Sequence, residues 1–352
     1  MDILSIIASA VIALASAGAV PAAAEKPTVS AKGCVVIDAL SGDVLYAHNE
    51  SLRLPMASTT KIMSAYIALQ QEQLDAPFVV DSEAIRVEGS SMGLREGDTV
   101  TLRSLVCGML LPSGNDAANA AAVRVAGSVP AFVGLMNDCA AEMGLENTRF
   151  VTPSGLDDDT DEHYSTALDM AKLTRQALKL DTFREICGSK TMQLEYGAPP
   201  YKRWLTNTNR LLGMCKGCIG VKTGFTDKAG RCLVSACERG GSTLICVTLN
   251  DKNDWADHQA LYDYCFGLMQ ETELSPELSG YRIECPDKGV AVTAVGECDS
   301  VLLPRSAVGR LERVTLIKPL IYLPVEAGEQ VGVTRFYLDG TIIASLPIKT
   351  AG

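Results

Sequence analysis

The sequence of 352 residues is poor in aromatic and basic residues, and histidine occurs only three times. Lys and Arg number 31 against 42 Asp and Glu, so the formal net charge is −11. This charge argues against nucleic acid or an anionic membrane surface as a partner, because both attract positive charge. The chain also lacks internal repeats and low-complexity linkers. Its 47% of apolar residues is ordinary for a globular protein long enough for two domains.

None of the three histidines shows a pattern typical of catalysis. His48 adjoins an expected strand and His258 lies on an expected helix, and neither has a serine or acidic partner pattern beside it. His163 follows an acidic stretch at residues 157–162. For His163 we expect packing or a surface role rather than catalysis.

Long apolar runs are absent except at the N-terminus, where residues 3–20 are almost entirely apolar and small. Ala22-Ala-Ala24 before Glu25 suits a small-residue cleavage site, so residues 1–24 are predicted to be a signal peptide. The residues before the apolar run depart from the usual signal-peptide pattern, because they contain Asp2 and no Lys or Arg. A transmembrane anchor is the alternative, although a glycine and a proline interrupt the run. After removal of the signal peptide we expect an extracytoplasmic protein, secreted or associated with the cell envelope.

Twelve cysteines in an exported protein raise three possibilities. Disulfide frameworks usually staple small domains that lack a core, and this chain is long enough to build one. A tetrathiolate zinc site could use Cys215, Cys218, Cys232 and Cys237, but the second pair is spaced by four residues on an expected strand. Several other cysteines lie in apolar surroundings, where a thiol acts as a small hydrophobe. We expect mostly free thiols and no bound metal or cofactor, with zinc and a disulfide as alternatives.

Hydrophobic periodicity predicts an α+β domain over residues 25–272. Two short strands around Ser41-Gly-Asp43 come first, a helical region follows, and three strands and a helix end the domain. The expected strands are 34–38, 44–47, 219–225, 231–237 and 243–249. The expected helices are 58–71, 101–110, 116–125, 129–143, 166–180 and 255–269. This order indicates a helical region packed beside an antiparallel sheet.

Residues 273–352 show short apolar runs separated by Gly and Pro turns, and they contain no catalytic motif. The expected strands are 290–295, 300–303, 314–316, 330–338 and 341–346. This pattern predicts a small C-terminal β-sandwich domain.

Three short motifs follow one another along the chain: Ser58-Thr-Thr-Lys61, Ser113-Gly-Asn115 and Lys222-Thr-Gly224. An S-x-x-K sequence alone is a weak signal, since a chain of this length holds about one by chance. All three motifs in this order, each in a matching local context, indicate a serine acyl-transfer enzyme.

The first motif supplies a nucleophile and a base. Ser58 and Lys61 are three residues apart at the start of an expected helix, so both side chains project from one face. Lysine can take the serine proton only if its pKa falls from about 10.4 toward about 7. Burial and a second cation, Lys222, both lower that pKa. The backbone N–H groups of Ser58 and Phe225 are the expected oxyanion donors.

The other two motifs supply a proton path and a substrate site. Ser113 is expected to pass a proton between the base and the leaving amine, and Asn115 to hold a substrate amide or to orient the base. The ammonium of Lys222 and the hydroxyl of Thr223 suit a terminal carboxylate. Gly224 lets a substrate backbone approach and pair along the strand edge.

With these motifs the sequence resembles the low-molecular-mass penicillin-binding proteins of the serine-type D-alanyl-D-alanine carboxypeptidase family. Other similar segments are Gly155-Leu-Asp157, His163-Tyr-Ser-Thr-Ala167, Asp169-Met-Ala171, Asn207-Thr-Asn209, Gly220-Val-Lys-Thr-Gly-Phe-Thr-Asp-Lys-Ala-Gly230 and residues 330–347. The resemblance implies an acyl-enzyme on Ser58, with Lys61 as base, Ser113 as proton relay and Lys222 as carboxylate-binding residue. It also implies peptidoglycan stem peptides ending in D-Ala–D-Ala as substrates and β-lactam antibiotics as inhibitors.

The sequence leaves other functions open besides that of a D-alanyl-D-alanine carboxypeptidase. A β-lactamase would need a deacylating carboxylate, for which Glu146-Asn147 is a candidate, but that pair follows a helix end and the second motif contains no Asp. D,D-endopeptidase or transpeptidase activity differs only in the bond cleaved or in the acceptor, and a non-catalytic penicillin-binding protein is a further class. Family members often continue into an amphipathic membrane-binding helix, whereas this chain stops at Gly352, so no C-terminal anchor is expected.

Overall fold

A computed structural model describes residues 25–157, 160–278, 281–285, 290–322 and 324–351. The predicted signal peptide, residues 1–24, lies outside the described residues. The chain divides into two units, one of residues 24–239 with 243–267 and one of residues 240–242 with 268–352. This division falls just before strand β10 (Met269–Leu274), close to the boundary expected between residues 272 and 273.

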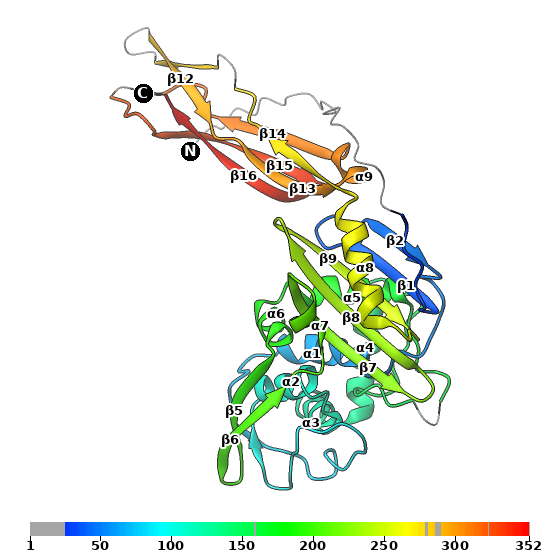
Figure 1. The fold of residues 1–352 in the computed structure, drawn as a ribbon. Coiled ribbons are helices and arrows are strands. Elements are labelled where there is room, and N and C mark those ends of the chain that lie inside the picture. Colours follow the sequence, from blue (N-terminus) through cyan, green and yellow to red (C-terminus); the bar gives the residue numbers. More distant parts are fainter. Residues whose placement is uncertain (1–24, 158–159, 279–280, 286–289, 323, 352) are drawn as a thin grey trace. The chain divides into compact units, whose positions relative to one another are not determined.

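The first unit is built on a five-stranded sheet in the order β2-β1-β9-β8-β7. The strands are β1 (Gly33–Asp38), β2 (Val44–His48), β7 (Cys218–Thr226), β8 (Gly230–Arg239) and β9 (Ser242–Leu249). The central strands are mostly apolar, and residues 232–237 of β8 and 244–249 of β9 are all buried. A strand buried on both faces needs a layer on each side. Helix α8 (Asp254–Phe266) covers one face and the helical region covers the other (Figure 1).

The helical region surrounds one apolar helix, α1 (Lys61–Leu69), in which every residue except Tyr66 is buried. The other helices of this unit are α2 (Leu102–Leu110), α3 (Asn115–Ala126), α4 (Val129–Glu142), α5 (Ala167–Ala177), α6 (Asp181–Gly188) and α7 (Leu211–Met214). Thr101, Ser128 and Thr166 each cap the helix that follows by accepting a backbone N–H on the side-chain oxygen. The predicted helices and the α+β class are confirmed.

The structure corrects the start of the first predicted helix. Ala57–Thr60 forms a single 3₁₀ turn, η1, and the α-helix begins only at Lys61. Ala57 has a positive φ of 48°, and the hydroxyls of Thr59 and Thr60 donate to the carbonyls of Met56 and Ala57. These side-chain bonds hold the tighter turn, so Ser58 lies in a separate turn joined to α1.

Six short elements of this unit, among them α7, were not predicted. Helix α6 and the hairpin of β5 (Thr191–Gly197) and β6 (Pro200–Thr206) lie between the helical region and β7. The hairpin joins β3 (Phe78–Val79) and β4 (Thr99–Val100) in a four-stranded sheet. In β5 the polar residues alternate with Met192, Leu194 and Tyr196, which are the less exposed positions. The sequence therefore contained the pattern of a half-buried strand, and the prediction missed it.

The second unit is the predicted C-terminal β domain. A five-stranded sheet has the order β11-β12-β16-β15-β14, and β10 pairs with β13 in a second sheet. The elements are β10, β11 (Arg282–Cys285), β12 (Val290–Gly296), β13 (Asp299–Pro304), α9 (Arg305–Val308), β14 (Leu311–Ile317), β15 (Gln330–Leu338) and β16 (Thr341–Thr350). Leu274 of β10 shares a buried cluster with Leu311, Phe336 and Leu346, so the two sheets pack face to face as in a sandwich.

Across the described ranges no single helix is long and apolar enough to cross a bilayer. The pair α3 and α4, bent by 85° where they join, passes the length and composition test together. Most of α3 is buried inside the first unit, which is the ordinary setting of such a helix.

Candidate active site

The S-x-x-K pair lies at the junction between η1 and α1. Lys61 Nζ donates a hydrogen bond of 2.8 Å to Ser58 Oγ, so the first residue of the helix meets the serine of the preceding turn. Lys61 has no exposed surface, whereas Ser58 is half-buried at the edge of a cavity. The predicted nucleophile is therefore accessible, and its predicted base is not.

The surroundings of Lys61 set its proton affinity. Besides Ser58, Nζ donates to Asn115 Oδ1 at 2.7 Å and to the carbonyl of Ser154 at 2.6 Å. Burial holds the pKa of Lys61 well below its usual value, and the cation of Lys222 lowers it further. Asp116 acts in the opposite direction and raises the pKa. The two lowering effects are those expected from the sequence, and they favour a lysine that is able to accept a proton.

The second motif occupies the turn between α2 and α3. Ser113 adopts a positive φ of 67° and reaches the cavity, and Asn115 begins α3. The Asn115 amide donates through Nδ2 to the carbonyl of Glu88 at 2.7 Å, which fixes its oxygen toward Lys61. The side-chain oxygen of Asn115 thus contacts Lys61, an arrangement that agrees with the second of its two expected roles, orienting the base.

The third motif lies on β7, the edge strand of the five-stranded sheet. Lys222 is only 1% exposed, and its Nζ donates to the carbonyl of Thr223 at 2.8 Å. Burial lowers the pKa of Lys222 to about 7. A Cβ on Gly224 would lie 3.1 Å from the nitrogen of Ser58, so the strand packs closely against η1. This close approach favours a glycine, and it brings the strand to the predicted nucleophile.

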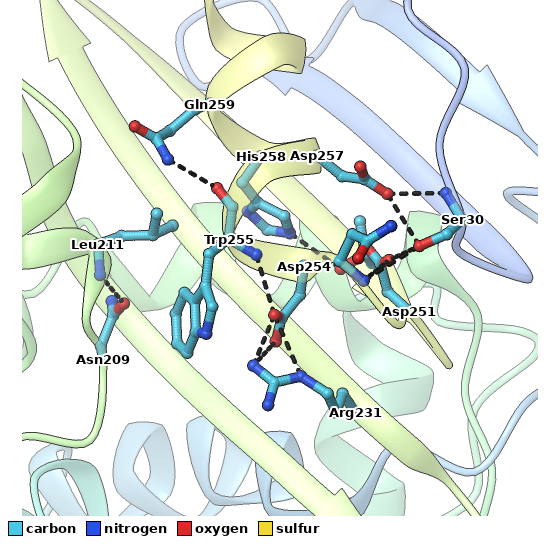
Figure 2. Close-up of polar contacts among 12 residues, drawn as sticks. Ser30, Asn209, Leu211, Arg231, Asp251, Asp254, Trp255, Asp257, His258 and Gln259 are labelled. Carbon is cyan, nitrogen blue, oxygen red and sulfur yellow. Dashed lines mark hydrogen bonds and ion pairs between the residues drawn. The ribbon is translucent and has the colours of Figure 1, made fainter.

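The hydroxyls of Thr223 and Thr208 hydrogen-bond to each other at 2.6 Å. Thr208 belongs to a loop held by asparagine side chains, in which Asn207 Oδ1 accepts the N–H of Asn209. Figure 2 shows the next bond, in which Asn209 Oδ1 accepts the N–H of Leu211. This loop therefore presents a second hydroxyl beside the one that the motif supplies.

A cavity of about 410 Å³ opens at this edge of the sheet. Its lining comprises Ser58, Ser90, Ser113, Thr208, Arg210, Thr223, Gly224, Phe225, Arg231, Cys232, Asp254 and Trp255. Five residues predicted from the motifs thus meet here, and Lys61, Asn115 and Lys222 lie buried behind them. The geometry is that of a serine acyl-transfer site with a buried lysine base and an edge strand for an extended substrate.

Residues 20–253 match the sequence pattern of peptidase S11, the D-alanyl-D-alanine carboxypeptidase family. The chain belongs to this family. Among curated relatives it is 30% identical to the carboxypeptidase DacF of Bacillus subtilis over 90% of this chain and 84% of the relative. It is 34% identical to DacC of Escherichia coli over 92% of this chain and 84% of the relative.

Solved structures agree with the family assignment. The DD-transpeptidase of Streptomyces K15 superposes with a TM-score of 0.66 at 34% identity and covers 70% of this chain and 100% of its own. The carboxypeptidase DacD of Francisella tularensis covers 96% of both chains with a TM-score of 0.64 at 26% identity. The chain is therefore a serine-type D-alanyl-D-alanine carboxypeptidase in class, as its motifs predicted.

The β-lactamase alternative finds no support in this carboxypeptidase. Glu146 is exposed and does not line the cavity, and the neighbouring Asn147 accepts hydrogen bonds from Arg53 instead. Helix α4 ends at Glu142, as expected, so this segment leads away from the helix as a surface turn.

One residue that was expected to have a packing or surface role supports the site directly. His163 is buried, and its Nδ1 accepts the N–H of Val151 at 2.9 Å. The proton of the neutral ring is then on Nε2, which lies 2.8 Å from the hydroxyl of Thr60 in η1. Burial lowers the pKa of His163 to about 4, so the ring stays neutral near pH 7. The sequence signal for this contact was that the segment starting at His163 resembles the corresponding segment of the carboxypeptidase family.

The other two histidines behave differently from each other. His258 is buried on α8 between the hydroxyls of Ser235 and Thr248, at 2.7 and 3.0 Å, and burial lowers its pKa to about 3. His48 ends β2 with an exposed side chain. Both lie outside the cavity lining, in keeping with the structural roles expected for them.

All twelve cysteines are free thiols in the structure. Cys218 pairs with Cys237 across β7 and β8, whereas Cys232 pairs with Gly224. Cys232 and Cys237 are five residues apart on one strand, about 17 Å, and their side chains point to opposite faces. The four-cysteine zinc alternative is therefore wrong, and no cluster of three or more metal-binding side chains occurs among the described residues.

Proposed function

We propose that Ser58 is the residue acylated by the substrate and that Lys61 is its general base. The observation that carries the proposal is the 2.8 Å contact between Ser58 Oγ and a lysine that is fully buried and has a strongly lowered pKa. A neutral Lys61 accepts the Oγ proton while Oγ attacks the carbonyl of the D-Ala–D-Ala bond. The new C–O bond forms as the carbonyl oxygen takes the negative charge.

The backbone N–H groups of Ser58 and Phe225 stabilise this oxyanion in the proposed mechanism. Gly224 supports this pairing, because its close packing against Ser58 brings β7 to the turn. Ser113, at the cavity, relays the proton from Lys61 to the leaving nitrogen of D-alanine as the C–N bond breaks. Water then attacks the ester, with the same groups acting in reverse, and the shortened peptide leaves.

The substrates we propose are peptidoglycan stem peptides that end in D-Ala–D-Ala, bound extended along the free edge of β7. β-Lactams would acylate the same serine, because their amide mimics the scissile bond and their leaving group stays tethered. Removal of residues 1–24 as a signal peptide would place the enzyme outside the cytoplasm.

Lys222 has two proposed roles that differ in what its ammonium contacts. The motif predicted that it binds the terminal carboxylate. Its burial, its bond to the Thr223 carbonyl and its effect on the pKa of Lys61 favour a role in keeping the base neutral. Thr223, Gly224 and the strand edge then carry the direct substrate contacts.

A fluorescent penicillin tests the proposal. The wild-type protein should label with one molecule per chain, and Ser58→Ala should lose the label while its circular dichroism and melting temperature stay unchanged. Labelling retained in the folded variant would place the nucleophile elsewhere.

Transpeptidation is the second candidate, because a similar solved structure is a DD-transpeptidase. Product analysis with a stem pentapeptide and an amine acceptor separates the two. Release of D-alanine with a tetrapeptide product indicates carboxypeptidase activity, whereas a cross-linked product indicates transpeptidation.

A further inference from the structure

Two cysteines meet at the turn that leads into β7, outside the lining of the active-site cavity. Cys215 directly follows α7, and Cys237 lies near the end of β8. The thiol of Cys237 donates to the carbonyl of Lys216 at 3.3 Å, and a Cβ on Gly217 would lie 3.3 Å from the same sulfur. The turn between α7 and β7 therefore wraps around the sulfur of Cys237.

The sulfur of Cys215 accepts two hydrogen bonds. One comes from the thiol of Cys237, and the other comes from Nη2 of Arg239 at 3.7 Å. The guanidinium is held in place, because Nη1 donates to Asp263 of α8 at 2.7 Å and Nε donates to the carbonyl of Lys216 at 3.3 Å. A thiolate at Cys215 is therefore stabilised by a neighbouring thiol and by a fixed positive charge.

These contacts give the two thiols different proton affinities. The hydrogen bond from Cys237 lowers the pKa of Cys215 to about 6 against the effect of burial, and the arginine lowers it further. The same hydrogen bond and burial raise the pKa of Cys237. Near pH 7 the pair therefore holds a thiolate at Cys215 and a thiol at Cys237. By contrast, burial raises the pKa of Cys107, Cys232 and Cys265 to about 12, so these thiols stay protonated.

We propose that hydrogen peroxide oxidises this pair to a reversible disulfide between Cys215 and Cys237. The thiolate sulfur of Cys215 attacks one peroxide oxygen, the O–O bond breaks, and hydroxide leaves while a sulfenic acid forms on Cys215. The sulfur of Cys237 then attacks the Cys215 sulfur, the S–O bond breaks, and the thiol proton leaves with the hydroxyl group as water. The two sulfurs lose two electrons, and the peroxide gains them. A peroxide is small enough to reach Cys215, which is only 7% exposed.

The disulfide closes a loop that contains all of β7 and the third motif. Strand β7 is the edge strand of its sheet and pairs with β8, and the two cysteines lie where β7 begins. A covalent link there joins the start of β7 to β8. It constrains the unfolded chain and so stabilises the strand that carries Lys222-Thr-Gly224. This inference does not depend on the acylation of Ser58.

The experiment treats the reduced full chain with hydrogen peroxide, alkylates the remaining thiols and identifies the peptides by mass spectrometry. Every protein, including the reference, carries Cys298→Ser, because the exposed Cys298 can link two molecules. The reference should yield a cross-linked peptide of Cys215 with Cys237, which dithiothreitol reverses. Cys237→Ser should give no cross-link and should leave a sulfenic acid on Cys215 that a 1,3-diketone probe traps.

Cys218→Ser is the matched control for the pair. Cys218 lies in the same turn and directly opposite Cys237 in the sheet register, but burial raises its pKa to about 11. This variant should therefore keep the cross-link. The oxidised reference should also melt about 5 °C above its reduced form, a rise that Cys237→Ser should lose.

Two charge variants test the arginine. Arg239→Gln removes the cation beside the Cys215 sulfur and should slow the oxidation of Cys215 near pH 7 by about three- to tenfold. Asp263→Asn breaks the same ion pair but removes a negative charge that raises the pKa of Cys215. It should therefore leave the rate of oxidation unchanged or increase it.

A cross-link between Cys215 and Cys218, or peroxide treatment that leaves both Cys215 and Cys237 as thiols, would overturn the proposal. Equal slowing in the two charge variants, or an unchanged melting temperature of the cross-linked protein, would also contradict it. Labelling by fluorescent penicillin, measured in parallel, reports on Ser58 and the proposed function whether or not the disulfide forms.

Discussion

Replacing Gly155 by alanine tests how tightly the nucleophile is held by its neighbours, without removing any catalytic group. Gly155 has a φ of +90°, and a Cβ there would lie 2.0 Å from the carbonyl oxygen of Ala57 and 3.0 Å from the nitrogen of Ser58. The preceding residue, Ser154, accepts a hydrogen bond from Lys61. The loop around Gly155 therefore touches both the turn of the nucleophile and the base.

The size of the effect follows from these distances. Cβ atoms essentially never come within 3.0 Å of another heavy atom, so the Ala57 carbonyl or the loop must move by at least 1.0 Å, the difference between 3.0 and 2.0 Å. A displacement of about 1 Å at a catalytic group costs about a hundredfold in rate. We expect kcat/KM for a D-Ala–D-Ala peptide and the rate of penicillin acylation to fall by about that factor.

The control is Gly127→Ala at the end of α3. Gly127 also has a left-handed backbone, with a φ of +77°, but no atom lies within 4 Å of the position that the new methyl group would take. Both variants carry a backbone strain of about 1–2 kcal/mol, which thermal melting measures. Stopped-flow acylation by a fluorescent penicillin then isolates the steric effect. Near wild-type acylation in a folded Gly155→Ala protein, or an equal loss in Gly127→Ala, would refute the reasoning.

Three further predictions concern protons and metal. The acylation rate should fall as the pH drops through the lowered pKa of Lys61, because the base must be neutral to accept a proton. Lys222→Met removes a nearby cation and should therefore raise the pKa of Lys61. In a pH–rate profile, the acid limb of this variant should then lie at higher pH than that of the wild type. The pKa of His163 is about 4 in the folded protein and about 6.5 unfolded, so its contribution to stability is complete above pH 6.5 and is lost as the pH falls toward 4. His163→Gln should reduce the pH dependence of the free energy of unfolding by up to one proton, and denaturant melts at several pH values check this. EDTA should leave peptidase activity unchanged, because a serine and a lysine supply the proposed nucleophile and base; loss of activity that added zinc restores would contradict it.

The sequence was sufficient for the elements whose pattern is strong. Apolar runs of β-branched residues predicted β7, β8 and β9, and helical spacing predicted α1 to α5, because burial on one or both faces leaves a periodic trace. Helix α6 and the hairpin of β5 and β6 were missed, although Met192, Leu194 and Tyr196 alternate with polar residues in β5. An element of seven or eight residues repeats such a pattern only two or three times, so it stands out less than a long one.

At the site, the sequence alone was enough to propose which residues carry the chemistry, because Ser58, Lys61, Ser113 and Lys222 belong to short motifs with local spacing. Only the tertiary structure decided how these residues are buried and which other residues they contact. It buried Lys222 behind the cavity and placed His163 against the turn of the nucleophile. These contacts join residues that are far apart in the chain. They depend on how distant segments pack together, and such packing produces no periodic pattern in the sequence of either segment.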